Sequence, residues 1–242
     1  MTKQFVDPDG LNPPLMVEDI EVTVYRIPEE YIIGMNSLVI SDIHFTSNKN
    51  LSESLPIVAK KTLSIILQKK ITSIFMLGDI VENRSHTRIE NLELIFNTFD
   101  KFGIPIFAIA GNHDRRVFKD IKYKNRFTNI HVILDSVMLL EHPNPEDGTI
   151  RRVLLSHNFM NDLWTNNVQS KVFAKRIKQV YNYMVKPDDF LLIGHVHIFN
   201  HDKENRCASL GTFSYDKHKA SYAIISESHG FKIDFFNEYI FK

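Results

Sequence analysis

The stretch Ser37-Leu-Val-Ile-Ser-Asp-Ile-His44 decides the fold, because a short apolar run leads directly into two residues that can bind a metal ion. Such a run predicts a buried strand, and side chains two residues apart in a strand point to the same side. Asp42 and His44 can therefore face one point if the strand persists that far. The stretch predicts a strand that serves as scaffold and a C-terminal end that supplies ligands.

The same arrangement recurs further along the chain, in Gly78-Asp79, Gly111-Asn-His-Asp114, Ser156-His157 and Gly194-His-Val-His197. Glycines at these points remove side chains where the backbone must turn sharply or approach an ion closely. Seven residues are able to bind metal: Asp42, His44, Asp79, Asn112, His157, His195 and His197. Nearly all of them directly follow an apolar run.

This set of ligands indicates the kind of ion. Imidazole, carboxylate and amide oxygen without thiolate suit manganese, iron, zinc or a similar divalent ion better than calcium alone or a structural zinc. A divalent ion takes about four to six ligands, so seven side chains suit two ions that share a carboxylate. Asp79 is the natural bridge, being the lone carboxylate between the two pairs.

The ordered blocks Asp-x-His, Gly-Asp, Gly-Asn-His-Asp, His and Gly-His-x-His resemble the calcineurin-like metallophosphoesterase superfamily over roughly residues 38–210. The resemblance implies two divalent ions, manganese first, with iron, zinc, nickel or magnesium as alternatives. It implies one metal site made by Asp42, His44, Asp79 and His197. It implies a second site made by Asp79, Asn112, His157 and His195. His113 would be the general acid beside the scissile phosphate, with Asp114 behind it to hold its tautomer.

The implied activity is a dinuclear metal-dependent phosphoester hydrolase, in which a hydroxide bridging the metals attacks phosphorus. We expect a phosphodiesterase or phosphatase acting on nucleotide-like or small phosphoesters. Two alternatives stay open: a DNA or RNA nuclease of the same superfamily, and a catalytically silent binding scaffold. The chain lacks the Gly-Asp-x-x-Asp-Arg-Gly and Gly-Asn-His-Glu signatures of protein serine/threonine phosphatases, so that branch is less favoured.

Each residue taken alone has a structural explanation. Asp42 and Asp79 could cap helices or form turns, and Asn112 could accommodate a positive φ beside Gly111. The functional interpretation depends on all seven occurring in order at predicted strand ends. One departure from the family pattern is Asn158, where many members have glycine, whereas Glu82, three residues after Asp79, stands where relatives often have an acid.

Other side chains near the blocks could contact the substrate. Arg115 and Arg116 could reach phosphate oxygens, although paired arginines at a helix start are more often solvated. Residues 82–88 and 158–168 are the expected specificity loops. Aromatic side chains close to ligands could stack on a base or pack the loops: Phe45, Phe159 and Trp164.

Composition limits the class of protein. The 242 residues suit one domain, with 1–36 as an N-terminal extension carrying an edge strand and 37–242 as the catalytic core. Lys plus Arg equals Asp plus Glu at 29 each, so the global basic footprint of a dedicated nucleic-acid binder is missing. We interpret the basic run at 171–178, in the first instance, as a solvated helix face. One cysteine, Cys207, excludes an intramolecular disulfide. We expect a cytoplasmic protein without a membrane span, and the oligomeric state stays open.

The order of the expected elements indicates an α/β protein. Expected strands at 38–40, 71–77 and 105–110 alternate with expected helices at 51–68 and 89–102, which predicts parallel strands with the site at their carboxyl ends. Further strands are expected at 21–25, 131–134, 137–140 and 151–155, a helix at 168–184, and a β-rich last fifty residues. The resemblance implies a four-layer αββα sandwich of two mixed β-sheets flanked by helices. Expected inward residues of the first helix are Leu55, Ala59, Leu63, Ile66 and Leu67.

Overall fold

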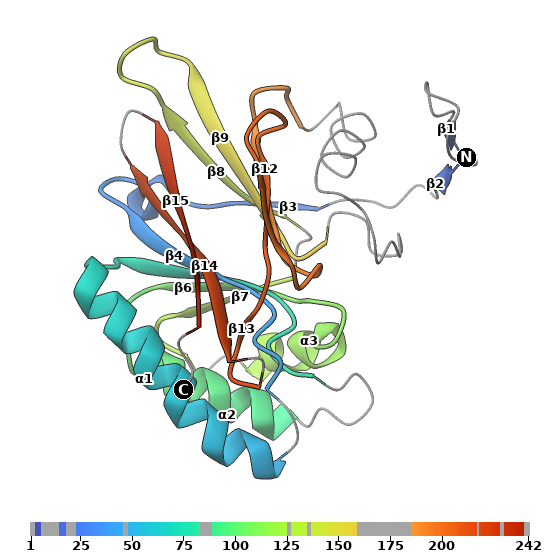
Figure 1. The fold of residues 1–242 in the computed structure, drawn as a ribbon, viewed down its shortest axis with the longest axis vertical. Coiled ribbons are helices and arrows are strands. Elements are labelled where there is room, and N and C mark those ends of the chain that lie inside the picture. Colours follow the sequence, from blue (N-terminus) through green and yellow to red (C-terminus); the bar gives the residue numbers. More distant parts are fainter. Residues whose placement is uncertain are drawn as a thin grey trace.

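The computed structural model is an α/β fold of two mixed β-sheets packed face to face, as predicted (Figure 1). It describes residues 3–5, 15–17, 23–45, 48–82, 89–124, 127–134, 137–158, 185–216, 218–227 and 230–239. The α-helices within these ranges all lie against the same sheet, the larger of the two. The helix expected at 168–184 lies outside the described residues, so only three of the four expected layers are described here.

The larger sheet has seven strands and carries the first half of the site. Its centre is parallel, because helices return the chain to the same edge after each strand, and β14 joins it antiparallel to β4. The strands, in spatial order, are β13 (Phe213–Ser214), β14 (Lys219–Glu227), β4 (Asn36–Ile40), β5 (Ser73–Leu77), β6 (Ile106–Ile109) and β7 (Ile130–Ile133), with β15 (Phe231–Glu238) paired to β14. The helices are α1 (Asn48–Lys69), α2 (Ile89–Asp100) and α3 (Arg115–Lys124).

The smaller sheet has six strands and carries the second half of the site. β10 runs parallel to both of its neighbours, whereas β8 and β9 form an antiparallel hairpin. The spatial order is β11 (Phe199–Asp202), β12 (Cys207–Leu210), β10 (Phe190–Ile193), β9 (Ile150–Ser156), β8 (Val137–Pro143) and β3 (Val24–Arg26). The expected strand near 21–25 is therefore an edge strand, displaced to Val24–Arg26. A 3-10 helix, Glu29–Tyr31, follows it, and β1 (Lys3–Phe5) pairs with β2 (Leu15–Val17).

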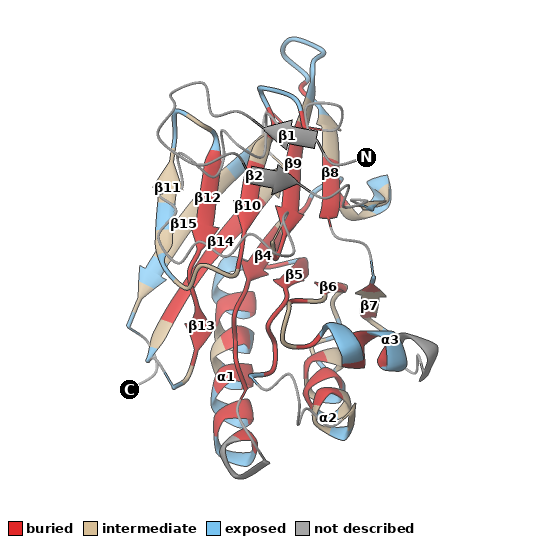
Figure 2. Ribbon diagram, turned by 90° about the vertical axis from the view of Figure 1, so that its right-hand side faces the viewer, coloured by how far each residue is buried: buried red, intermediate tan, exposed pale blue. Residues whose placement is uncertain are grey.

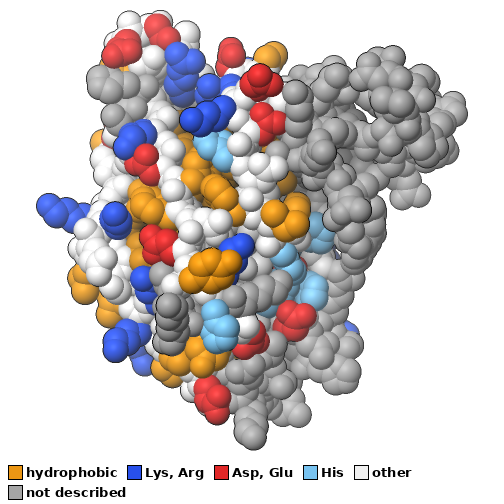
Figure 3. Space-filling view, viewed as in Figure 1, with side chains coloured by type: hydrophobic (Ala, Val, Ile, Leu, Met, Phe, Trp, Pro, Cys, Tyr) orange, Lys and Arg blue, Asp and Glu red, His pale blue; other side chains and the backbone are white. Residues whose placement is uncertain are grey.

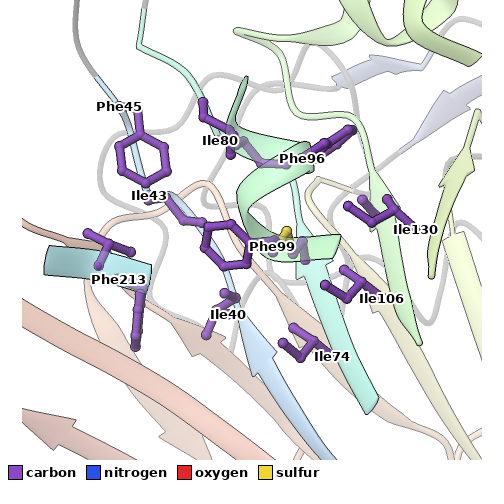
Figure 4. Packing of buried hydrophobic residues seen from close by; sticks show 14 of the residues in the cluster. Ile40, Ile43, Phe45, Ile74, Ile80, Phe96, Phe99, Ile106, Ile130 and Phe213 are labelled. Atoms are coloured by element: carbon purple, nitrogen blue, oxygen red, sulfur yellow. The ribbon is translucent and has the colours of Figure 1, made fainter. Parts of the chain in front are cut away.

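Alternating side chains of the central strands fill two apolar layers. In β4, Leu38 and Ile40 face the helices, whereas Val39 faces the other sheet. Figure 2 shows the buried residues concentrated in the strands and on the inner sides of the helices. On the helix side, Phe96 and Phe99 of α2 lie over the strand residues shown in Figure 4. These layers fix the relative positions of the strand ends.

The expected inward face of α1 is partly wrong. Leu67 is 71% exposed and Leu63 is 39% exposed. In a helix of 3.6 residues per turn, each four-residue step rotates a side chain by about 40°, so a row of such steps drifts off the core face. The face that packs on the sheet instead alternates four- and three-residue steps, and its buried residues include Leu51, Leu55, Val58, Thr62 and Ile65.

We predict that Phe96→Ala lowers the free energy of unfolding by about 3–5 kcal/mol, because truncating a buried aromatic ring leaves a cavity. The Phe96 ring is fully buried between the rings of Phe118 and Phe127, at centroid distances of 5.8 and 5.5 Å. Leu94→Ala, at a 51% exposed position of the same helix, is the control and changes stability by about 0.5 kcal/mol at most. Urea unfolding of both variants measures this, and equal losses would contradict the packing.

Candidate metal centre

The ends of five strands bring the ligand candidates of both sheets together. Asp42 and His44 follow β4, Asp79 follows β5, and Asn112 follows β6. His157 follows β9, and His195 and His197 follow β10. All seven side chains take part in the contacts described below. Their role as ligands stays a prediction.

The first group joins residues that are up to 155 positions apart in the sequence. Nε2 of His44 lies 2.8 Å from Nε2 of His197 and 4.0 Å from Oδ2 of Asp79. Oδ1 of Asp42 lies 3.2 Å from Nε2 of His197. One potential ligand atom from each of these four residues lies within 4.8 Å of the others. The group therefore offers two imidazoles and two carboxylates around one point.

The second group also includes Asp79. Nε2 of His157 is 3.3 Å from Oδ2 of Asp79. Oδ1 of Asn112 is 3.0 Å from Nε2 of His157 and 3.0 Å from Nδ1 of His195. Asp79 thus belongs to both groups, and its role as a bridge between two ions stays a prediction.

The residues present fit divalent ions. Asp42 is fully buried, and its Oδ2 accepts hydrogen bonds from the hydroxyl of Ser41 and the backbone N–H of His195. Its Oδ1 is also buried but accepts no hydrogen bond of good geometry from any described residue. Burying a carboxylate oxygen that accepts no hydrogen bond is costly, and a cation held between this oxygen and the imidazole nitrogens would offset that cost.

The ligand candidates converge through backbone turns, contrary to the expected continuation of the strands. β4 ends at Ile40 and β10 at Ile193, before either ligand pair. Positive φ values of 48–67° occur at five candidates: Asp42, His44, Asp79, His195 and His197. Non-glycine residues rarely adopt this conformation, and such strain gathers at functional sites. The strained turns aim all five side chains inward.

Glycines allow this close packing, as the sequence predicts. A Cβ added at Gly111 would lie 2.1 Å from Oδ1 of Asp79, and one at Gly194 would lie 2.0 Å from Oγ of Ser41. A Cβ at Gly78 would lie 2.4 Å from the backbone nitrogen of Gly111. Each glycine therefore makes room for a neighbouring part of the centre.

Partners outside the centre fix the orientation of two imidazoles. Nδ1 of His157 lies 2.7 Å from the carbonyl oxygen of Leu77, which turns Nε2 toward Asp79. Nδ1 of His44 lies 2.6 Å from Oε2 of Glu82, which turns its Nε2 toward His197. Such partners set the tautomer and the ring orientation of a metal ligand. Sequence reasoning noted Glu82 but missed this contact, although its place three residues after Asp79 was visible.

His113 lies beside the centre, but its partner differs from the expected one. Its backbone N–H donates to Oδ1 of Asp79 at 2.9 Å, and its ring Nδ1 contacts the carbonyl oxygen of Glu82. Nε2 of His113 is 3.9 Å from Oδ2 of Asp79. The ring is therefore held by backbone, with Nε2 turned toward the centre.

The expectation that Asp114 sets the tautomer of His113 is wrong. Oδ1 of Asp114 accepts the backbone N–H of Gly111 at 2.6 Å, and Oδ2 accepts that of Ile80 at 2.7 Å. Both oxygens of this fully buried carboxylate are thus engaged in tying two strand-end turns together. Burial, with a smaller contribution from the negative charge of Asp79, raises the pKa of Asp114 to about 7.

Mutual attraction favours the charged forms of Asp42, Asp79 and His157. Burial alone would lower the pKa of His157, but hydrogen bonding and attraction to Asp79 raise it to about 9. Burial would likewise raise the pKa of Asp42, but His197 and His44 hold it well below its ordinary value. Burial and the neighbouring His157 lower the pKa of His195. The two carboxylates remain negative beside imidazoles, which suits a cation site.

Some of the remaining candidates lie within the described residues, and others lie outside them. Phe45 is buried in the core between the helices and the larger sheet, and its backbone forms an isolated β-bridge with Val81. It therefore contributes to core packing and does not face a substrate. Arg115 and Arg116 are exposed at the start of α3. Phe159, Trp164, the basic run at 171–178 and most of both expected specificity loops lie outside the described residues.

Comparison with known proteins identifies one matching family model. It is described as calcineurin-like phosphoesterase and matches residues 35–199, which include all seven ligand candidates. No curated protein matches the chain. Within the described ranges, no helix combines the length and apolar character that crossing a membrane requires.

Three solved structures are similar to the chain at low sequence identity. A Thermotoga maritima protein is 15% identical, with a TM-score of 0.44, covering 84% of this chain and 99% of that one. A Thermus thermophilus protein is 9% identical, with a TM-score of 0.44 and the same coverages. The Pseudomonas putida nuclease MPE is 16% identical, with a TM-score of 0.35, covering 66% of this chain and 61% of that one.

We predict that Gly111→Ala destabilises the fold by about 3 kcal/mol and abolishes tight manganese binding, because the added Cβ overlaps the Asp79 carboxylate. Gly148→Ala is the matched control. Gly148 has a positive φ but no neighbouring atom within 4 Å, so this change costs about 1–2 kcal/mol from strain and preserves metal binding. Thermal unfolding and metal analysis after dialysis measure both effects, and wild-type metal content in Gly111→Ala would contradict the arrangement.

Proposed function

This chain belongs to the calcineurin-like phosphoesterase family, and from this premise we propose that it is a dinuclear metal-dependent hydrolase of small or nucleotide-like phosphoesters. The observation that carries the proposal is the shared position of Asp79. Its Oδ2 lies 3.3 Å from Nε2 of His157 and 4.0 Å from Nε2 of His44, which belong to different groups. A single carboxylate between two sets of ligands is the arrangement that a pair of ions requires.

The residues divide into two ligand sets around that bridge. Asp42, His44 and His197 would complete one site with Asp79, and Asn112, His157 and His195 would complete the other. When bound, two divalent ions neutralise the charge of a phosphate and lower the pKa of a shared water. We propose manganese as the first ion to test, because the oxygen and imidazole donors suit it.

His113 would supply the proton that the leaving oxygen needs. Its Nδ1 faces the carbonyl oxygen of Glu82, so a proton on Nδ1 is held there by a backbone acceptor. When the ring carries a second proton, its Nε2–H faces the centre and can donate to a developing alkoxide. Asp114 contributes indirectly, because it fixes the turn that carries His113.

The charge balance supports a small substrate. Lys plus Arg equals Asp plus Glu, at 29 each, whereas proteins that track long nucleic acids carry a basic surface. We further propose the cytoplasm as the compartment, supported by a single cysteine, Cys207, which is buried in β12.

The assay for this proposal compares a phosphodiester with a phosphomonoester. Purified protein supplied with manganese is expected to hydrolyse bis-p-nitrophenyl phosphate, p-nitrophenyl phosphate or both, and to lose activity with EDTA. A nuclease would instead cleave single-stranded DNA in preference to both small esters. Metal-loaded protein that cleaves none of these substrates would contradict the proposal and favour a silent scaffold.

Variants at the bridge and at the acid are expected to separate metal binding from turnover. Asp79→Ala loses both ions, because each set of ligands shares that carboxylate. His113→Ala keeps both ions but slows turnover by about 10²–10⁴-fold, the usual contribution of a general acid. The controls are Asp234→Ala, which removes a carboxylate of β15, and His218→Ala, which removes an imidazole in the turn before β14.

The measurements are metal content by mass spectrometry and initial rates with the small esters. Equal metal content in wild type and Asp79→Ala would contradict the bridging assignment. Wild-type rates in His113→Ala would remove His113 from the proposed chemistry while leaving the metal assignment intact.

A further inference from the structure

A cavity of about 450 Å³ opens far from the metal centre, where the β8–β9 hairpin, the start of β10, β11 and β15 meet. We propose that it binds a small phosphorylated ligand with a planar ring, of the class of nucleoside monophosphates. Its volume lies within the range of about 300–1,000 Å³ that is usual for small-molecule sites. This inference does not depend on the proposed hydrolase activity.

The cavity and the metal centre lie at opposite ends of the same strand. Arg151 and Val153 line the cavity near the start of β9, whereas His157 follows the end of that strand. At about 3.3 Å per residue, the six residues from Arg151 to His157 span about 20 Å. A ligand in the cavity would therefore not contact the metal centre.

One wall of the cavity is built from rings. His201 of β11 lies against Phe235 of β15, with ring centroids 4.3 Å apart. Phe190 completes the group, at 6.0 Å from His201 and 6.2 Å from Phe235. Phe231 and Ile233 extend the same wall along β15 and are only partly buried. Partly exposed rings held in a fixed cluster can take a planar apolar group by stacking or edge contact.

Basic side chains also line the cavity. Its lining contains three arginines, Arg151, Arg152 and Arg206, against a single acidic residue, Glu146. Figure 3 shows Lys and Arg side chains beside a histidine and apolar side chains on the face that carries β9, β12 and β15. The lining therefore combines guanidinium groups with apolar surface.

The three arginines differ in how far the protein compensates their charge. Arg152 is buried, with Nε 3.4 Å from Glu141 and Nη1 3.6 Å from Asp189, so two carboxylates offset it. We assign it to the wall of the cavity and not to the ligand-binding groups.

Arg151 and Arg206 are the two groups that can reach a ligand. Arg151 pairs with Asp147 at 2.7 Å, but the pair is exposed and so contributes little to stability. Its stem lies over Gly230, where a Cβ would come within 2.7 Å of Cγ of Arg151. Arg206 donates from Nε to the carbonyl oxygen of Asp188, and within the described residues it forms no ion pair.

A phosphate monoester matches these two guanidinium groups. It carries about −1.5 to −2 charges and several acceptor oxygens, and guanidinium groups bind phosphate through two parallel N–H donors. The guanidinium groups of Arg151 and Arg206 select a phosphate, and the ring wall selects a ligand with a planar group.

The test is calorimetric titration of the full chain with adenosine 5′-monophosphate in the presence of EDTA. EDTA removes metal ions, so neither hydrolysis nor binding at the metal centre contributes. We expect saturable binding at one site, and weaker binding of both adenosine and inorganic phosphate. Arg206→Gln and Arg151→Gln are each expected to weaken binding by about tenfold or more, the value of one charged hydrogen bond.

Lys232→Gln is the matched control, because Lys232 is an exposed cation of β15 that does not line the cavity. It should bind adenosine 5′-monophosphate as the wild type does. Unfolding temperatures measured without ligand show that each variant is folded, as expected for changes at solvent-accessible arginines. Absence of binding, equal affinity in all variants, or inorganic phosphate binding as tightly as the nucleotide would each overturn the proposal.

Discussion

The structure depends on two carboxylates, Asp42 and Asp79, that are buried where the two sheets meet at their strand ends. Each is at most 1% exposed, and a buried charge is tolerated only when other charges or hydrogen bonds compensate it. Imidazoles that follow strands of the smaller sheet supply that compensation, with His197 3.2 Å from Asp42 and His157 3.3 Å from Asp79. Three features bring these groups to one place: the strained turns, the glycines that leave room for neighbouring atoms, and the hydrogen bonds between Asp114 and two backbone amides.

Much of the fold follows from patterns visible in the sequence. Apolar runs place β4, β5 and β6 correctly, and their alternation with helices indicates parallel pairing. The elements that the sequence did not predict, such as α3 and β11, have weaker hydrophobic patterns. α3 begins with Arg115 and Arg116, and β11 reads Phe-Asn-His-Asp, so hydrophobic periodicity does not mark either of them. β11 forms through backbone pairing with β12, which depends on tertiary context.

The site was accessible from the sequence as a set of residues but not as a geometry. The order of the blocks indicates which side chains to examine, and the structure brings all seven together; their function as ligands stays a prediction. The left-handed turns at Asp42 and His195 could not be read from strand periodicity, which predicts alternating faces. The roles of Glu82 and Asp114 also required coordinates, because Glu82 contacts His44 and Asp114 accepts hydrogen bonds from backbone amides.

The two-sheet architecture separates two chemically different regions along one strand. β9 leads from the arginine-lined cavity at its start to His157 at its end, through a segment buried in the core.

The most direct test of the central claim is anomalous diffraction from crystals soaked with manganese. The account predicts two peaks about 3.5–4 Å apart on either side of the Asp79 carboxylate. A single peak that Asp79 does not contact, or no peak among these residues, would contradict it.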